Sequence, residues 1–159
     1  MCAPGPVVGL QPVVEALVPG LPSAPWGVVL FGSAARAEAT ETSDLDLLVV
    51  ADDLPHRFIE RIRLLRGLAP ASLQGKIALI AKSQSEFEEG FPSYYPDLGL
   101  DGIVLYDRER YMEGKLERIR ELIELAGLTR RRLDHGFAWR WREPPVGHWR
   151  IDWSGVHGQ

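Results

Sequence analysis

The chain has only one cysteine among its 159 residues, Cys2, which excludes an internal disulfide and fits a reducing compartment. It has no apolar run close to the roughly 20 residues that a helix needs to cross a bilayer. Its first residues lack the basic segment that is typical of a signal peptide. These absences predict a cytoplasmic protein with no membrane association.

Histidine clusters are missing as well. None of the 4 histidines lies at zinc-site spacing from a cysteine or an aspartate. With 45% hydrophobic and 25% charged residues, the chain has the composition of a soluble globular protein with one well-packed domain. Its net charge of −4 is uneven, because residues 1–107 hold 7 Lys and Arg against 14 Asp and Glu, whereas residues 108–159 hold 11 against 8. A salt-bridged surface explains the basic C-terminal part more simply than nucleic-acid binding.

The most informative stretch is residues 28–50, where two apolar strands flank a Gly-Ser turn and a short Ala-rich helix. The second strand opens with Asp44 and Asp46, which point to the same side because side chains alternate along a strand. Two neighbouring carboxylates at the mouth of a buried strand repel each other and are costly to desolvate. A divalent cation relieves both costs, and all-oxygen ligands suit magnesium. We therefore expect Asp44 and Asp46 to bind a metal ion.

Gly32 and Ser33 predict an anion site beside these carboxylates. Glycine allows a sharp turn and a close approach of the backbone to a ligand. Ser33 is expected to cap the N-terminus of a helix that runs through Ala34, Ala35 and Arg36. The free N–H groups of its first turn and the helix dipole attract anions. An anion site next to a cation site is suited to a metal-bound polyphosphate.

The two motifs together, Gly-Ser-Ala-Ala-Arg at residues 32–36 and Ser-Asp-Leu-Asp-Leu at residues 43–47, resemble the signature of the polymerase-β-like nucleotidyltransferase superfamily. Among its branches, the chain is most similar to the small minimal nucleotidyltransferases. The resemblance extends over the larger, N-terminal part of the chain, and its diagnostic residues lie between Gly32 and Asp46. The family has a glycine where this chain has Ala37, and alanine restricts the turn.

The resemblance implies that Asp44 and Asp46 are catalytic ligands of Mg²⁺ or Mn²⁺. It also implies that Ser33 and the backbone of Gly32 and Ala34 bind the β- and γ-phosphates, and that Arg36 orients the loop or binds phosphate. The implied reaction moves a nucleoside monophosphate, usually AMP from ATP, to an acceptor hydroxyl and releases pyrophosphate. Minimal nucleotidyltransferases often act as antitoxins that adenylylate a HEPN-type ribonuclease. Such a toxin, another protein, a small molecule or an RNA end is then the acceptor, with RNA less favoured.

A third carboxylate, which the family carries on the neighbouring strand, is missing from residues 73–82. The expected register places Ala78 near that position. Three acids elsewhere are candidates to replace it, namely Glu86, Asp97 and Asp101, although a helix-start or loop role explains each of them more simply. Either one of these acids completes the site, or the enzyme uses one metal ion, or the protein is a catalytically weak or inactive nucleotide- or partner-binding protein of the same fold.

The hydrophobic pattern and the resemblance predict an α+β fold, in which helices pack on a small mixed β-sheet. Strands are expected at residues 26–31, 44–50, 73–82 and, on a sheet edge, 102–107, and helices at residues 7–21, 56–66 and 111–126. Ser83 and Glu86 are spaced as a capping box. Residues 1–107 are expected to form the nucleotidyltransferase core. Residues 108–159 would form a C-terminal helix and a basic, aromatic tail packed on it in one compact domain, with a homodimer as an alternative use of the helix.

The tail alternates aromatic and basic side chains over residues 137–142, which predicts a strand with a packed aromatic face. Residues 144–147 would turn the chain, and residues 148–153 would return as the partner strand of a β-hairpin. The same residues could stack on bases in an RNA-binding module, which is the less favoured alternative.

Overall fold

The computed structural model describes residues 8–158. Cys2 and the expected start of the first helix at residue 7 lie outside this range.

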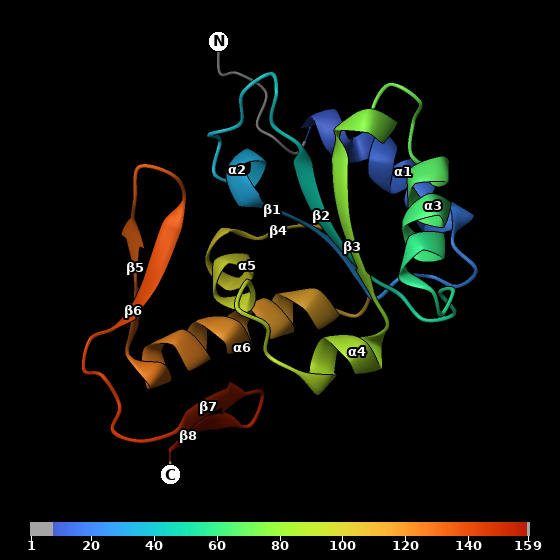
Figure 1. The fold of residues 1–159 in the computed structure, drawn as a ribbon. Coiled ribbons are helices and arrows are strands. Elements are labelled where there is room, and N and C mark those ends of the chain that lie inside the picture. The colour runs from blue at the N-terminus through green and yellow to red at the C-terminus, as the bar shows by residue number, and fades with distance from the viewer. Residues whose placement is uncertain (1–7, 159) are drawn as a thin grey trace.

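A four-stranded mixed sheet forms the centre of the molecule (Figure 1). Its strands are β1 (Gly27–Phe31), β2 (Leu45–Val50), β3 (Ile77–Lys82) and β4 (Ile103–Asp107). They lie in the order β3-β2-β1-β4, with β1 antiparallel to both of its neighbours and β2 parallel to β3. All four expected strands are present, and β4 occupies an edge of the sheet as predicted. The second strand begins one residue later than expected, and the third begins at Ile77 instead of residue 73, because residues 74–76 form a 3-10 turn.

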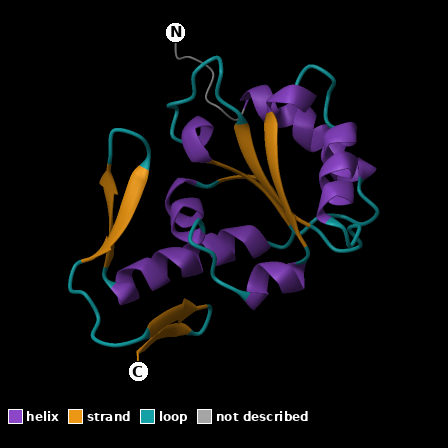
Figure 2. Cartoon of the chain, in the orientation of Figure 1, coloured by secondary structure: helices purple, strands orange, loops and turns teal. Residues whose placement is uncertain are grey.

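Helices cover both faces of this sheet (Figure 2). A 3-10 turn (Val8–Leu10), α1 (Gln11–Gly20) and α3 (Phe58–Leu68) lie on one face, and a second 3-10 turn (Gln74–Lys76) precedes β3. The other face carries α4 (Gln84–Glu89), α5 (Tyr95–Asp101) and α6 (Tyr111–Ala126). The α+β fold is therefore confirmed.

The strands divide their side chains between two hydrophobic clusters, one on each face. On β2, Leu47 and Val49 belong to the cluster under α1 and α3, whereas Leu48 and Val50 belong to the cluster under α5 and α6. Because side chains alternate along a strand, Asp46 lies on the α5/α6 face. This alternation decides which elements surround the predicted metal-binding carboxylates.

Helix α6 has the bounds that its hydrophobic period predicts. Its apolar stripe packs on the sheet through buried side chains such as Met112, Leu116 and Ile119, which share a cluster with Val29 of β1. Gly127 ends the helix in the left-handed conformation, with φ +64°, where glycine carries no Cβ penalty. The predicted glycine stop is confirmed.

The predicted capping box begins α4. The Ser83 side chain accepts a hydrogen bond from the Glu86 backbone N–H (3.2 Å), and the Ser83 N–H donates to the Glu86 carboxylate (2.9 Å). Glu86 also accepts hydrogen bonds from the buried guanidinium of Arg61 at 2.5 and 2.9 Å. Hydrogen bonding to Arg61 lowers the pKa of Glu86 to about 2. Glu86 therefore has a structural role at the start of α4.

The tail forms two hairpins instead of the predicted one. Strand β5 (Leu128–Arg132) pairs with β6 (Phe137–Trp141), and β7 (Trp149–Asp152) pairs with β8 (Gly155–Gly158). The prediction that residues 137–142 pair with residues 148–153 is wrong. Both segments are strands, and aromatic residues of both pack on the second cluster, but each finds its partner in a nearer segment. A short, Gly136-containing turn (φ +85°) closes the first hairpin.

Among the residues that the structure describes, no helix combines the length and apolar character required to cross a membrane.

Candidate active site

The Gly-Ser turn and the aspartates meet where β1 and β2 lie side by side. Phe31, the last residue of β1, is paired with Asp46 of β2. The next residue, Gly32, has φ +72°, and a Cβ added to it would lie 2.2 Å from the Asp46 Oδ2. The backbone thus turns directly against the Asp46 carboxylate, at a distance that only glycine permits. The close approach predicted for Gly32 is present, and its neighbour is Asp46.

The two aspartates form a like-charged pair at the mouth of β2. Asp44 directly precedes the strand and is exposed, whereas Asp46 is half-buried. Burial and the nearby Asp44 charge raise the pKa of Asp46, against the smaller opposing effect of Arg36. Ionised Asp46 is therefore destabilised in the folded chain, and a bound cation would relieve this. Within residues 8–158, no group of three or more His, Cys, Asp or Glu side chains is placed to hold a metal ion.

Helix α2 (Gly32–Ala35) follows the turn, and its capping differs from the prediction. The residue at the N-cap position is Phe31, and no side chain caps this end, so the predicted capping role of Ser33 is wrong. Ser33 lies inside the first turn because α2 begins one residue earlier, at Gly32, whose carbonyl accepts a hydrogen bond from the Arg36 N–H at 3.3 Å. Ser33 contributes instead at the other end, where its carbonyl accepts a hydrogen bond from the Glu38 N–H at 2.9 Å.

Ala37 occupies the position that ends α2 in the left-handed conformation, with φ +57°. Its N–H bonds to the Ala34 carbonyl at 3.2 Å, and the following N–H of Glu38 bonds to the Ser33 carbonyl. These two bonds make a Schellman motif, in which the left-handed residue is usually glycine. The structure therefore explains why a glycine is favourable at this position: an alanine here lowers the stability of the fold through its left-handed backbone.

We expect Ala37→Gly to stabilise the protein by about 0.5 to 1 kcal/mol, because the relief of left-handed strain exceeds the entropy that glycine adds to the unfolded chain. Chemical denaturation of both proteins measures this difference. Ala35→Gly is the matched control, since Ala35 lies in right-handed helix and its replacement should destabilise by a similar amount. A loss of stability in Ala37→Gly would contradict the inference that the backbone is strained at Ala37.

The strand next to Asp46 presents no carboxylate to it. In the parallel pairing of β2 with β3, Asp46 faces Ala78. Glu86 is bound to Arg61 and Ser83, as described above. The structure thus gives one of the three candidate acids a structural partner remote from the motif residues.

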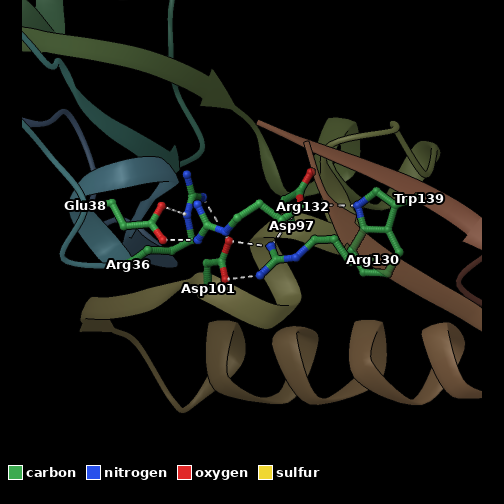
Figure 3. Close-up of polar contacts among 7 residues, drawn as sticks. All are labelled: Arg36, Glu38, Asp97, Asp101, Arg130, Arg132 and Trp139. Carbon is green, nitrogen blue, oxygen red and sulfur yellow. Dashed lines mark hydrogen bonds and ion pairs between the residues drawn. The ribbon is translucent and has the colours of Figure 1, made fainter. Parts of the chain in front are cut away.

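The other two candidates bind arginines (Figure 3). Asp97 accepts hydrogen bonds from Arg130 (3.0 Å) and from the Trp139 indole N–H (3.2 Å). Asp101 accepts two from Arg130, at 2.6 and 2.8 Å, and one from Arg36 at 3.1 Å. Although burial opposes it, hydrogen bonding to Arg130 and Arg36 keeps the pKa of Asp101 below its usual value. Asp101 thus reaches the motif through Arg36, as an ion-pair partner.

Several residues in this region were not singled out from the sequence. Arg132 pairs with Glu38, which also accepts a hydrogen bond from Arg36 at 3.0 Å. The guanidinium groups of Arg36, Arg130 and Arg132 all lie within 4.9 Å of the Phe137 ring centroid. The basic run at residues 130–132 was visible in the sequence. Side chains two residues apart lie on the same face of a strand, so Arg130 and Arg132 share a face. This could be predicted only if residues 128–132 were recognised as a strand.

Comparisons with known proteins agree with this geometry. Residues 23–111 match the family model "Polymerase beta, Nucleotidyltransferase". Over 109 residues, 61% of this chain and 69% of the relative, the chain is 33% identical to "Putative protein adenylyltransferase MJ1305" of Methanocaldococcus jannaschii. It also resembles a solved toxin-antitoxin structure with AMP-PNP, with a TM-score of 0.55 at 19% identity, over 72% of this chain and 86% of the other. At that identity the structural likeness concerns the fold alone. The family match, which includes both motifs, shows that this chain belongs to the polymerase beta nucleotidyltransferase family.

Proposed function

We propose that this protein is a metal-dependent nucleotidyltransferase that moves AMP from ATP to a hydroxyl of a partner protein and releases pyrophosphate. The observation that carries the proposal is the contact between the Gly32 turn and the Asp46 carboxylate. It brings a turn suited to phosphate next to a carboxylate suited to a cation, which is the combination that a metal-bound triphosphate needs.

The carboxylates of Asp44 and Asp46 would hold a magnesium ion, or manganese in its place. Their chemistry fits such an ion, because both are oxygen ligands, and because burial and then the Asp44 charge raise the pKa of Asp46, so that its ionised form gains from a nearby cation. When bound, the ion neutralises charge on the phosphates and supports departure of pyrophosphate.

The turn would bind the far end of the triphosphate. We assign contacts with the β- and γ-phosphates to the Ser33 hydroxyl and to the backbone of Gly32 and Ala34. The acceptor oxygen then forms a bond to the α-phosphorus, the bond between that phosphorus and the pyrophosphate oxygen breaks, and the acceptor proton passes to solvent. A side-chain base for this proton would normally lie opposite Asp46, where this chain has Ala78.

The names of the relatives support a protein as the acceptor. The Methanocaldococcus jannaschii relative is named as a protein adenylyltransferase, and the solved neighbour is a toxin-antitoxin complex with an ATP analogue. We therefore propose that this chain is an antitoxin whose acceptor is a toxin, and the resemblance to minimal nucleotidyltransferases suggests the HEPN type. We further propose that residues 1–107 form the catalytic core and that residues 108–159 pack on it in the same domain in the cytoplasm.

A nucleotide-binding protein with little or no transferase activity is the second candidate. Ala78 opposite Asp46 favours it, because a missing base and metal ligand lowers rates by about 100- to 10,000-fold. The two candidates share nucleotide binding and differ in turnover.

Calorimetry with ATP and magnesium tests the proposal, with pyrophosphate release followed in parallel in the presence of a candidate toxin. We expect binding that is lost in the Asp44→Ala/Asp46→Ala variant, and pyrophosphate release that requires the toxin. Glu41→Gln removes an exposed charge from the same loop and should leave both readouts unchanged. Binding without release across several toxins would favour the second candidate. Absence of magnesium-dependent nucleotide binding would refute both.

A further inference from the structure

The β5–β6 hairpin lies outside the segment that matches the family model, yet it contacts the signature motif. The match ends at residue 111, and the hairpin begins at Leu128. Its Arg130 binds both carboxylate oxygens of Asp101, and Asp101 in turn binds Arg36. Figure 3 shows this chain of contacts from the hairpin through α5 to the end of α2.

These contacts are well shielded from solvent. The exposed fraction is 8% for the Asp101 side chain, 15% for Arg130 and 20% for Arg36. The Arg130–Asp101 pair is bidentate, the arrangement that fixes an arginine in both position and orientation. Shielded pairs of this kind lose less to salt and solvent than exposed ones do. The Arg130–Asp101 link is therefore a defined structural joint, unlike the exposed ion pairs elsewhere on the surface.

A second link joins the hairpin to the residue that follows the left-handed turn. Arg132 pairs with Glu38, and Glu38 also binds Arg36. The Phe137 ring lies among the three guanidinium groups, at 4.2 Å from that of Arg130 and 4.8 Å from that of Arg36. An aromatic face attracts these cations, so it offsets part of their mutual repulsion. The hairpin thus contacts both Arg36 and Glu38, on either side of Ala37.

The Arg36 side chain forms ion pairs with both Glu38 and Asp101. Its guanidinium donates to Glu38 and to Asp101, and the three arginines of the network face three acids, Glu38, Asp97 and Asp101. Of the two roles expected for Arg36, orientation of the loop fits these contacts, because its charge is already balanced. The loop that it orients begins at Gly32, whose position against Asp46 defines the candidate site.

We propose that Arg130 and Asp101 are positioning residues for the nucleotide, which they influence through Arg36 and the α2 turn. The C-terminal hairpin thereby becomes a support of the active site. This inference rests on the proposed binding of magnesium-ATP at Gly32 and Asp46. Neither Arg130 nor Asp101 is assigned a contact with the nucleotide.

The test compares Arg130→Gln with Arg131→Gln in the full-length protein. Both variants remove one positive charge from β5, but Arg131 is exposed, points to the other face of the strand and makes no ion pair among the described residues. We expect Arg130→Gln to raise the Kd for magnesium-ATP about tenfold, with KM affected more than kcat, whereas Arg131→Gln changes the Kd less than about twofold. Hydrogen exchange at residues 36–43 of the nucleotide-free protein should accelerate in Arg130→Gln alone.

Arg130→Lys provides a variant that keeps the charge and loses the bidentate geometry, and its Kd should lie between those of wild type and Arg130→Gln. Thermal unfolding of each variant checks that it is folded. Equal exchange rates or equal Kd values for Arg130→Gln and Arg131→Gln would overturn the positioning role. A wild-type protein that binds no nucleotide would refute the proposed function instead, and the exchange measurement separates these two failures.

Discussion

Replacing Asp46 with asparagine is expected to lower nucleotidyl transfer about a thousandfold, because it removes a ligand of the proposed metal ion at the point where the Gly32 turn meets β2. Asparagine has the same shape, so the turn and the strand pairing should persist. Pyrophosphate release at saturating ATP and magnesium, with a candidate toxin present, measures the loss. Glu41→Gln controls for the removal of a negative charge from the neighbouring loop.

The same substitution is expected to increase stability when no metal is bound. Burial and the Asp44 charge raise the pKa of Asp46 above its unfolded value, so the folded chain binds a proton more tightly than the unfolded chain does. Ionised Asp46 therefore destabilises the fold at neutral pH, and the penalty disappears as the pH falls below the unfolded pKa near 3.8. Urea denaturation in the presence of a chelator should show Asp46→Asn more stable than wild type at pH 7 and equal to it at low pH.

Magnesium should reverse this order, since the proposed site would bind it only in folded wild type, and binding stabilises the folded state by mass action. Two results would contradict the proposed role of Asp46 as a metal ligand. One is an Asp46→Asn variant as active as wild type. The other is a difference in stability between wild type and the variant that changes with neither pH nor magnesium.

The second large effect is expected for Gly32→Ala. The new Cβ would lie 2.2 Å from the Asp46 Oδ2, so the carboxylate must move away from the turn. Misplacement of about 1 Å at a reacting centre can lower a rate about 100-fold, and we expect a loss of that size in turnover. Stability should fall by only about 1 kcal/mol, which is the cost of a left-handed alanine, because the atom that the new Cβ would meet is the far end of a rotatable side chain.

Gly127→Ala is the matched control for this substitution. Gly127 also has positive φ, +64°, but a Cβ added there meets no atom within 4 Å. We expect a similar loss of stability, measured by urea denaturation, with unchanged turnover per folded molecule. If the two variants lose activity equally, the effect of Gly32→Ala comes from backbone strain alone and the contact with Asp46 has no catalytic importance.

The sequence determined those features that depend on neighbouring residues. Helix α6 followed from its hydrophobic period, and the start of α4 followed from the Ser83 and Glu86 spacing. The face of the sheet on which Asp46 lies follows from alternation along β2, and the turn at Gly32 follows from the absence of a Cβ. Such signals depend on residues close together in the sequence, so they can be recognised from the sequence alone. The sequence also showed that residues 73–82 carry no acid, and the structure adds that Ala78 of β3 is the residue opposite Asp46.

Only the tertiary structure decided how the tail meets the site. The partner of β6 is β5, and strand partners are selected by turn geometry and packing that alternation alone does not specify. The hydrogen-bond partners of Asp97 and Asp101 depend on that pairing, because Arg130, which binds both, is 33 and 29 residues away from them in the sequence. Arg132 and Glu38 are 94 residues apart. A charged side chain can pair with any opposite charge that folding brings near, and its sequence neighbourhood does not record which one. The motif was therefore readable from the sequence, and its support by the C-terminal hairpin was not.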